Sequence, residues 1–146
     1  MSKRNGKHGR VVFRPTEEWR EKRDRERKFE WVSLDDGSEV CVWANRVREG
    51  LAITAASTPP AALGGDGTPD EQAAMTWTVQ LACHTDEPPE GELVFTPATL
   101  WAINELSPGE FGRIIAAVLR VNGASPEDAE RLQAFTTRTR AARSAS

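Results

Sequence analysis

Few side chains in this sequence of 146 residues could carry out chemistry, and the cysteines and histidines are the first to consider. Cys83 and His84 are adjacent at the predicted end of a helix, so their side chains point in different directions. No second Cys/His pair is present to complete a zinc site. A dyad for nucleophilic catalysis could pair Cys41 with His84, but it would also need an orienting group and an oxyanion site. Because we find no secretory signal, we expect both thiols to be buried and not joined in a disulfide.

The acidic and glycine-rich stretches do not match a phosphate or cation site. Residues 64–67, Gly-Gly-Asp-Gly, lack the Lys-Ser/Thr and the preceding strand of a phosphate-binding loop. Asp66, Asp70 and Glu71 lack the spacing of a calcium loop. The other carboxylate pairs lie in turn-like stretches: Asp35/Asp36 and Glu90/Glu92. We therefore expect a non-enzymatic protein with no catalytic residues, no cofactor and no metal.

Charge is distributed unevenly along the chain. The net charge is −3, but residues 1–28 contain 11 Lys and Arg against 5 acids, and the remainder is acidic. Residues 16–29 interleave acids and bases at i,i+4 spacing, which is typical of a solvated helix. The excess positive charge lies in a tail that we expect to be mobile. Its basic residues are an alternative nucleic-acid site, although we expect no nucleic-acid partner: Lys3, Arg4, Lys7, Arg10 and Arg14.

The stretch FEWVSLDDGSEVCVW, residues 29–43, predicts a β-hairpin. A three-residue loop, Asp35-Asp36-Gly37 with Gly37 at positive φ, gives both strands a consistent pattern. One face then carries Phe29, Trp31, Cys41 and Trp43, and the other carries Val32, Leu34, Val40 and Val42. Because both faces are apolar, we expect one to cover the helices and the other to meet the N-terminal arm or a partner, with both faces internal as the favoured interpretation.

From residue 44 onward the sequence predicts helices. Residues 44–57 form a short helix, 58–68 an exposed Pro/Gly-rich loop, and the apolar stretch 73–84 a central helix. Four helix starts carry a hydroxyl residue followed by proline, a combination that caps a helix and fits its first turn: Thr68-Pro69, Thr96-Pro97, Ser107-Pro108 and Ser125-Pro126. The helix after Ser107 has a clear apolar stripe, and Asn122-Gly123 ends it.

Together these elements predict an α+β fold in which about five or six helices form a small bundle with one N-terminal β-hairpin. Residues 1–28 form a basic arm with a charged helix, and residues 29–146 form a single domain. Within it we place a hairpin (29–43), helices (44–140), a loop (58–68) and a frayed tail (141–146). The longest apolar run, residues 114–119, is far shorter than a membrane span, so we expect a cytoplasmic protein without membrane contact.

This organisation resembles that of the tail assembly chaperones of long-tailed bacteriophages, particularly those of actinobacterial hosts. The resemblance covers residues 29–140, from the hairpin WVSLDDGSEVCVW to the terminal helices LSPGEFGRIIAAVLRVNGASPEDAERLQAF. It implies a non-enzymatic protein of the host cytoplasm that masks apolar helices of the tape measure protein while the tail tube polymerises. It also implies absence from the finished virion and often a longer product made by translational frameshifting.

The resemblance brings no catalytic residues, so the candidate site is a protein-binding surface made of apolar residues: Trp31, Trp43, Phe111, Ile115, Leu119, Leu132 and Phe135. For the helical residues of this set, the core and a binding surface both remain open. The main alternative function is a structural adaptor that stays in a phage or another large assembly and binds through the second hairpin face. The third is a nucleic-acid-binding accessory protein that uses residues 3–14. Self-association is a further option.

Overall fold

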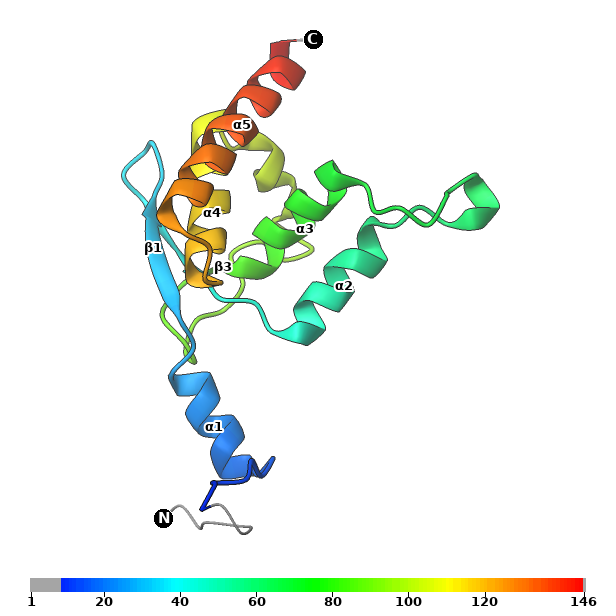
Figure 1. Ribbon diagram of the computed structural model, residues 1–146. Helices are drawn as coiled ribbons and strands as arrows, with labels where there is room; N and C mark the ends of the chain where they lie inside the picture. The colour runs from blue at the N-terminus through cyan, green and yellow to red at the C-terminus, as the bar shows by residue number, and fades with distance from the viewer. Residues whose placement is uncertain (1–8, 146) are drawn as a thin grey trace.

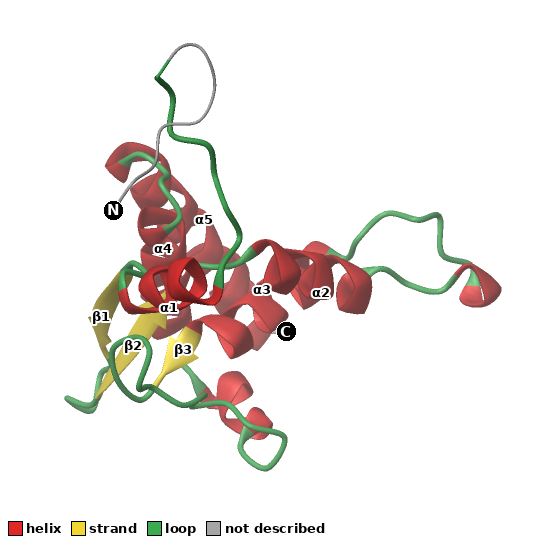
Figure 2. Ribbon diagram, turned by 90° about the horizontal axis from the view of Figure 1, so that it is seen from below, coloured by secondary structure: helices red, strands yellow, loops and turns green. Residues whose placement is uncertain are grey.

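The computed structural model describes residues 9–145, without the side chains at 129, 132, 135, 139, 140 and 142–145. Within this range the chain is a mixture of helix and strand, as predicted (Figures 1 and 2). The strands are β1 (Phe29–Ser33), β2 (Glu39–Trp43) and β3 (Cys83–His84). The α-helices are α1 (Glu17–Arg25), α2 (Val47–Ser57), α3 (Glu71–Ala82), α4 (Pro108–Val121) and α5 (Pro126–Ala145). Two short 3₁₀ helices are η1 (Ala61–Leu63) and η2 (Leu100–Glu105).

The hairpin has the predicted register and the predicted three-residue loop. Phe29 pairs with Trp43, and the N–H of Leu34 donates to the carbonyl of Ser38 at 2.7 Å. Gly37 has a φ of 88°, a left-handed conformation that glycine adopts without strain. The two predicted faces follow from this register: Phe29, Trp31, Cys41 and Trp43 on one side, and Val32, Leu34, Val40 and Val42 on the other.

A third strand extends the sheet, where the sequence predicted a lone hairpin. The helix α3 ends at Ala82, and the backbone becomes extended at Cys83, with φ −85° and ψ 124°. His84 then pairs with Cys41 in an antiparallel β2–β3 ladder and forms a bridge with Leu93. The strand order β1-β2-β3 places β1 at an edge of the sheet.

The centre of the fold is α4, so the prediction of a central helix at residues 73–84 is wrong. Eight residues of α4 are buried, whereas the buried residues of α3 are Val79 and Ala82. The valine face of the hairpin packs on α4, and α5 runs along α4 (Figure 1). Gly112 allows this close approach, because a Cβ there would collide with the side chain of Thr137.

Two of the four predicted helix caps are confirmed. The hydroxyl of Ser107 accepts from the N–H of Glu110 at 3.1 Å, and the Glu110 carboxylate accepts from the N–H of Ser107 at 2.8 Å. This reciprocal pair is a capping box at the start of α4. The hydroxyl of Ser125 accepts from the N–H of Asp128 at 3.2 Å at the start of α5.

The other two predicted caps are wrong because nearby side chains form better local bonds. The carboxylate of Asp70, two residues after Thr68, accepts from the N–H of Gln72 at 2.9 Å and caps α3. The hydroxyl of Thr99 accepts from the N–H of Thr96 and donates to the carbonyl of Val94, both at 2.8 Å. These bonds favour a turn over a helix start at Thr96, and η2 follows that turn.

The tip of the hairpin is anchored to the start of α4. The carboxylate of Asp35 accepts from Arg113 Nη2 at 2.7 Å and from the Ser107 hydroxyl at 3.0 Å. On the opposite side of the molecule, α2 packs on α3, whose other side contacts α4 and β2, and residues 58–70 lie at the outer end of this helical pair (Figure 1). Of the helices described, none has the length and apolar character to cross a membrane.

Candidate protein-binding surface

Of the two hairpin tryptophans predicted to bind a partner, Trp43 lies in the core. Its side chain is 7% exposed. Its indole stacks on the imidazole of His84, with ring centroids 3.6 Å apart and planes 7° apart, and the guanidinium of Arg27 lies 5.1 Å from the indole centroid. The indole N–H donates to the carbonyl of Asp86 at 2.9 Å. Because these groups enclose Trp43, its prediction as a partner-binding residue is wrong.

Trp31 is the exposed tryptophan of the hairpin. Its side chain is 39% exposed, and that of Phe29, two residues earlier on the same face, is 40% exposed. The indole N–H of Trp31 donates to the carboxylate of Glu87 at 3.3 Å. The β2 residues of this face, Cys41 and Trp43, are buried. The second hairpin face is therefore internal along β2 and open along β1.

The outer edge of β1 carries backbone groups that face away from β2. The carbonyl of Lys28 accepts from the N–H of Ala44 at 2.9 Å, and Leu34 bonds to Ser38, so the even-numbered residues of β1 point their amides at β2. The odd-numbered residues point theirs outward. The carbonyl of Ser33 accepts from Arg113 Nε at 3.2 Å. In the described part of the chain, the outward N–H and C=O groups of Phe29 and Trp31 have no partner.

Two pockets lie along this edge, and Arg120 lines both. The first, of about 570 Å³, is formed by residues 25–30 and the end of α4. The second, of about 370 Å³, is formed by residues 31–34 with side chains of α4 and α5. Between them, the Arg120 guanidinium bonds the carboxylate of Glu30, with Nε at 3.1 Å and Nη2 at 3.0 Å. We call the outer edge of β1 with these two pockets the β1 groove. Strand β1 forms the outer margin of the sheet in both ribbon views (Figures 1 and 2).

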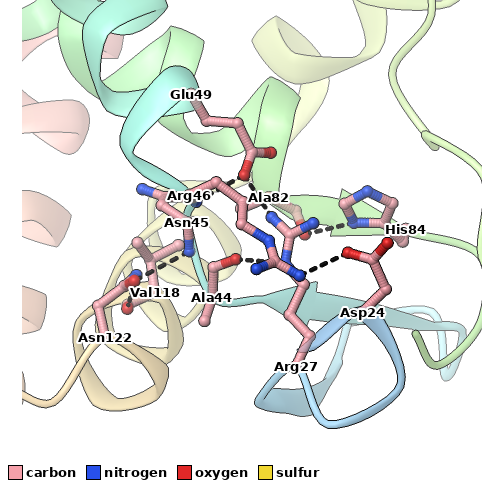
Figure 3. Close-up of polar contacts among 10 residues, drawn as sticks. All are labelled: Asp24, Arg27, Ala44, Asn45, Arg46, Glu49, Ala82, His84, Val118 and Asn122. Carbon is pink, nitrogen blue, oxygen red and sulfur yellow. Dashed lines mark hydrogen bonds and ion pairs between the residues drawn. The ribbon is translucent and has the colours of Figure 1, made fainter. Parts of the chain in front are cut away.

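A largely buried polar cluster fixes α1, and with it one end of the β1 groove, to the body (Figure 3). The Arg27 guanidinium donates from Nη2 to the carboxylate of Glu49 and from Nε to the carbonyl of Ala44 at 2.6 Å. The side chains of Arg27 and Glu49 are 10% and 16% exposed. A second ion pair, Arg46 with Asp24 at 2.6 Å, joins the start of α2 to the end of α1.

The same cluster reaches the end of α4. The N–H of Asn45 donates to Asn122 Oδ1 at 2.9 Å, and Asn122 Nδ2 donates to the carbonyl of Val118 at 2.7 Å (Figure 3). Burial lowers the pKa of Arg27 from its ordinary value, and the neighbouring Glu49 carboxylate opposes that shift. The cluster therefore joins α1, α2 and α4 through groups that need one another's charge or hydrogen bonds.

The helical residues predicted to bind a partner are mostly core residues. Phe111 is fully buried and Ile115 is 4% exposed, so the prediction that they form a binding surface is wrong for both. Leu119 is partly buried against the same core. Leu132 and Phe135 belong to α5, but their side chains lie outside the described residues. The apolar stripe of α4 faces the sheet and α5, which explains why it is not free for a partner.

The cysteines and His84 are arranged as structural groups. Cys41 lies opposite His84 in the sheet, but its thiol is fully buried, and burial raises the thiol pKa to about 11. The thiolate that a nucleophile requires is therefore disfavoured. Cys83 is also buried, its pKa is raised by burial to about 12, and both cysteines are free, as predicted. Across residues 9–145, no group of three His, Cys, Asp or Glu is placed to hold a metal ion.

The alternative nucleic-acid site lies partly outside the described structure. Lys3, Arg4 and Lys7 are outside the described residues, while Arg10 and Arg14 are exposed. Between these two arginines the chain exposes three apolar side chains, Val11 at 62%, Val12 at 46% and Phe13 at 58%. The described part of the arm is therefore apolar as well as basic.

Sequence reasoning missed the strongest feature of this surface, which is the position of β1 at the sheet edge. The hairpin pattern identified the face of Phe29 and Trp31, but it did not show that β3 would join β2 and leave β1 open. The signal was the short apolar segment around Cys83, which was assigned to a helix.

No protein-family model, curated protein or solved structure matches this chain.

Proposed function

We propose that this chain is a non-enzymatic protein-binding factor that receives an extended segment of a partner protein in the β1 groove. The observation that carries the proposal is the coincidence of outward backbone groups and exposed aromatic side chains at Phe29 and Trp31. An edge strand with free N–H and C=O groups can pair with an added strand, and adjacent pockets then select its side chains. The two pockets, which share Arg120 as a lining residue, provide such positions.

The charges around Trp31 favour a segment that carries basic residues beside its apolar ones. Glu39 is exposed and lines a further hollow with Trp31, and Glu87 is exposed and bonds the Trp31 indole. A basic side chain of the partner segment would be attracted to the Glu39 and Glu87 carboxylates, and it would not have to displace an arginine that is already paired with them. The preferred partner segment is therefore extended, apolar at alternate positions and basic at its flanks.

For the biological setting, we propose the tail assembly role that the resemblance implies, with the tape measure protein as the partner. The burial of Phe111 and Ile115 disfavours masking of apolar helices by the α4 stripe. Binding would instead involve extended segments of the partner at the β1 groove. A structural adaptor is the second candidate, and the exposure of Phe29 and Trp31 favours it too, because that role uses the second hairpin face. Purified virions separate the two, since a chaperone is absent from them and an adaptor is present.

The test is co-expression with the tape measure protein, followed by affinity capture in high salt. Trp31→Lys places a charge on the strand edge and removes an aromatic contact, so we expect captured partner to fall at least tenfold. The matched control is Trp101→Lys, because Trp101 is 67% exposed on η2, outside the β1 groove. Equal capture by the Trp31→Lys variant and the native chain would rule out the β1 groove as the binding surface.

A further inference from the structure

We propose that the β1 groove also binds the N-terminal arm of a second copy of this chain, through residues 10–14. This inference concerns the same groove as the proposed function and rests on it, but it names a different occupant. The sequence of the arm segment is Arg-Val-Val-Phe-Arg. Valine and phenylalanine favour strands, and the three apolar side chains of this segment are exposed in its own chain.

The side-chain pattern of the arm fits the two sides of the groove. In an extended strand, Val11 and Phe13 point to one face, while Arg10, Val12 and Arg14 point to the other. Two apolar side chains at that spacing are about 7 Å apart, and the two pockets follow one another along β1, so we assign one side chain to each pocket. Val12 would then lie on the side of Trp31.

Charge complementarity favours the same arrangement. With Val12 over Trp31, the two flanking arginines lie on the face that carries the exposed carboxylates of Glu39 and Glu87. On a larger scale, residues 1–28 are basic and the remainder of the chain is acidic. Arg10 and Arg14 are therefore attracted to the carboxylates on the Trp31 side, whereas the first pocket, which Arg25, Arg27 and Lys28 line, receives an apolar side chain.

The geometry of α1 directs the arm to another copy. Phe13 contacts Trp19 edge-to-face, with ring centroids 4.8 Å apart, and the Thr16 hydroxyl caps α1 by accepting from the N–H of Trp19 at 3.1 Å. In the single chain these contacts keep the arm at the end of α1 that is far from the sheet, and Phe13 would leave Trp19 to enter the groove of a second copy (Figure 1). Three residues between Phe13 and α1 span at most about 11 Å, while nine helical residues are about 13.5 Å long. With α1 intact, residues 10–14 cannot run along β1 of their own chain.

Reciprocal exchange of arms would produce a closed dimer in which each copy contributes one strand to the other. Such a dimer would cover both β1 grooves until a partner segment displaces the arms. The arm and the partner segment would then compete for one surface.

The first measurement is the self-association of the full chain by sedimentation velocity across a concentration series. We expect a monomer–dimer equilibrium, with the dissociation constant raised at least tenfold by the arm variant Val11→Ser/Phe13→Ser and by Trp31→Lys. Val47→Ser is the matched control, since Val47 is 82% exposed on α2, away from the groove. Urea unfolding of each variant checks that the fold is retained.

A mixing experiment identifies the two surfaces as a pair. The arm variant has an intact groove and the Trp31→Lys variant has an intact arm, so their mixture should form a heterodimer at concentrations where each alone is monomeric. A native chain that stays monomeric at millimolar concentration would overturn the inference, as would a dimer that both variants form unchanged.

Partner capture distinguishes this inference from the proposed function. The arm variant leaves the groove open, so it should capture the tape measure protein at least as well as the native chain does. If that variant captures partner normally and dimerises normally, the arm exchange is wrong and the partner groove stands. If Trp31→Lys abolishes the dimer but leaves capture intact, the groove binds the arm and the proposed partner site is wrong.

Discussion

The ion pair between Arg27 and Glu49 makes a quantitative prediction about stability. The two side chains are 10% and 16% exposed, so neither charge is well solvated in the folded state. In the native chain the Glu49 carboxylate also accepts from the N–H of Arg46 at 2.7 Å. Glu49→Gln removes the negative charge but keeps an oxygen that can accept from Arg27 and from this N–H. The variant therefore leaves a guanidinium that is largely buried without a counter-ion.

Breaking one side of a buried ion pair costs about 3–5 kcal/mol. We expect the lower end, about 3 kcal/mol, because Arg27 keeps its bond to the carbonyl of Ala44 and the amide of the variant retains an acceptor. For 146 residues the entropy of unfolding is about 0.3 kcal/mol/K, so the melting temperature should fall by about 10 °C. Glu49→Ala also removes the cap of α2 and should cost about 1 kcal/mol more.

The assay is urea unfolding followed by tryptophan fluorescence, since Trp43 is buried in contact with Arg27. Glu90→Gln is the matched control, because Glu90 is exposed and its variant should stay within about 0.5 kcal/mol of the native chain. A double variant, Arg27→Met/Glu49→Leu, removes both charges and should recover much of the loss. A loss below about 0.5 kcal/mol for Glu49→Gln would refute the view that this pair is shielded from water.

Three further predictions concern the core. Gly112→Ala should lower the unfolding free energy by about 1–3 kcal/mol, because the new methyl group collides with Thr137. In Gly109→Ala the new methyl group would lie 3.5 Å from its nearest neighbour, so the unfolding free energy should be unchanged or higher, and urea unfolding compares the two variants. Burial lowers the pKa of His84, so below about pH 6.5 the unfolded chain binds a proton more readily than the folded chain does. The urea concentration at the unfolding midpoint should therefore be lower at pH 5 than at pH 7, and this difference should be smaller in His84→Phe. Burial raises the pKa of both cysteine thiols and shields them from solvent. A thiol reagent at pH 8 should therefore label them only as fast as the chain unfolds, and rapid labelling of the folded chain would contradict their burial.

Local patterns predicted the hairpin well and the long-range arrangement less well. The register followed from the alternation of apolar residues around Asp-Asp-Gly, which is local information. The capping box at Ser107 was also local. The third strand was missed because its two residues, Cys83 and His84, continue the apolar pattern of α3 and become a strand through pairing with β2.

The candidate site shows the same limit. The sequence identified Trp31 as a candidate, but it treated Trp43 as equivalent, since both lie on one face of the hairpin. What separates them is the position of their strands, because Trp43 meets His84 and Arg27 while Trp31 is at the open edge. Whether the apolar stripe of α4 is buried or exposed depended likewise on a neighbouring helix, α5. The apolar pattern of the sequence does not specify that α5 packs against Gly112.

The attachment of α2 has a consequence for local opening of the native state. Helix α2 packs mainly on α3, and its first turn holds α1 through the Arg27–Glu49 and Arg46–Asp24 pairs. A helix with so few buried side chains, Ile53 and Ser57, is expected to open at a lower free energy than α4 does. When α2 opens, the end of α1 at Asp24 and the following residue Arg27 lose their ion pairs at once. Amide hydrogens of α1 and α2 should therefore exchange with deuterium as one cooperative unit, and the direction in which residues 10–14 leave the body depends on how α2 holds α1.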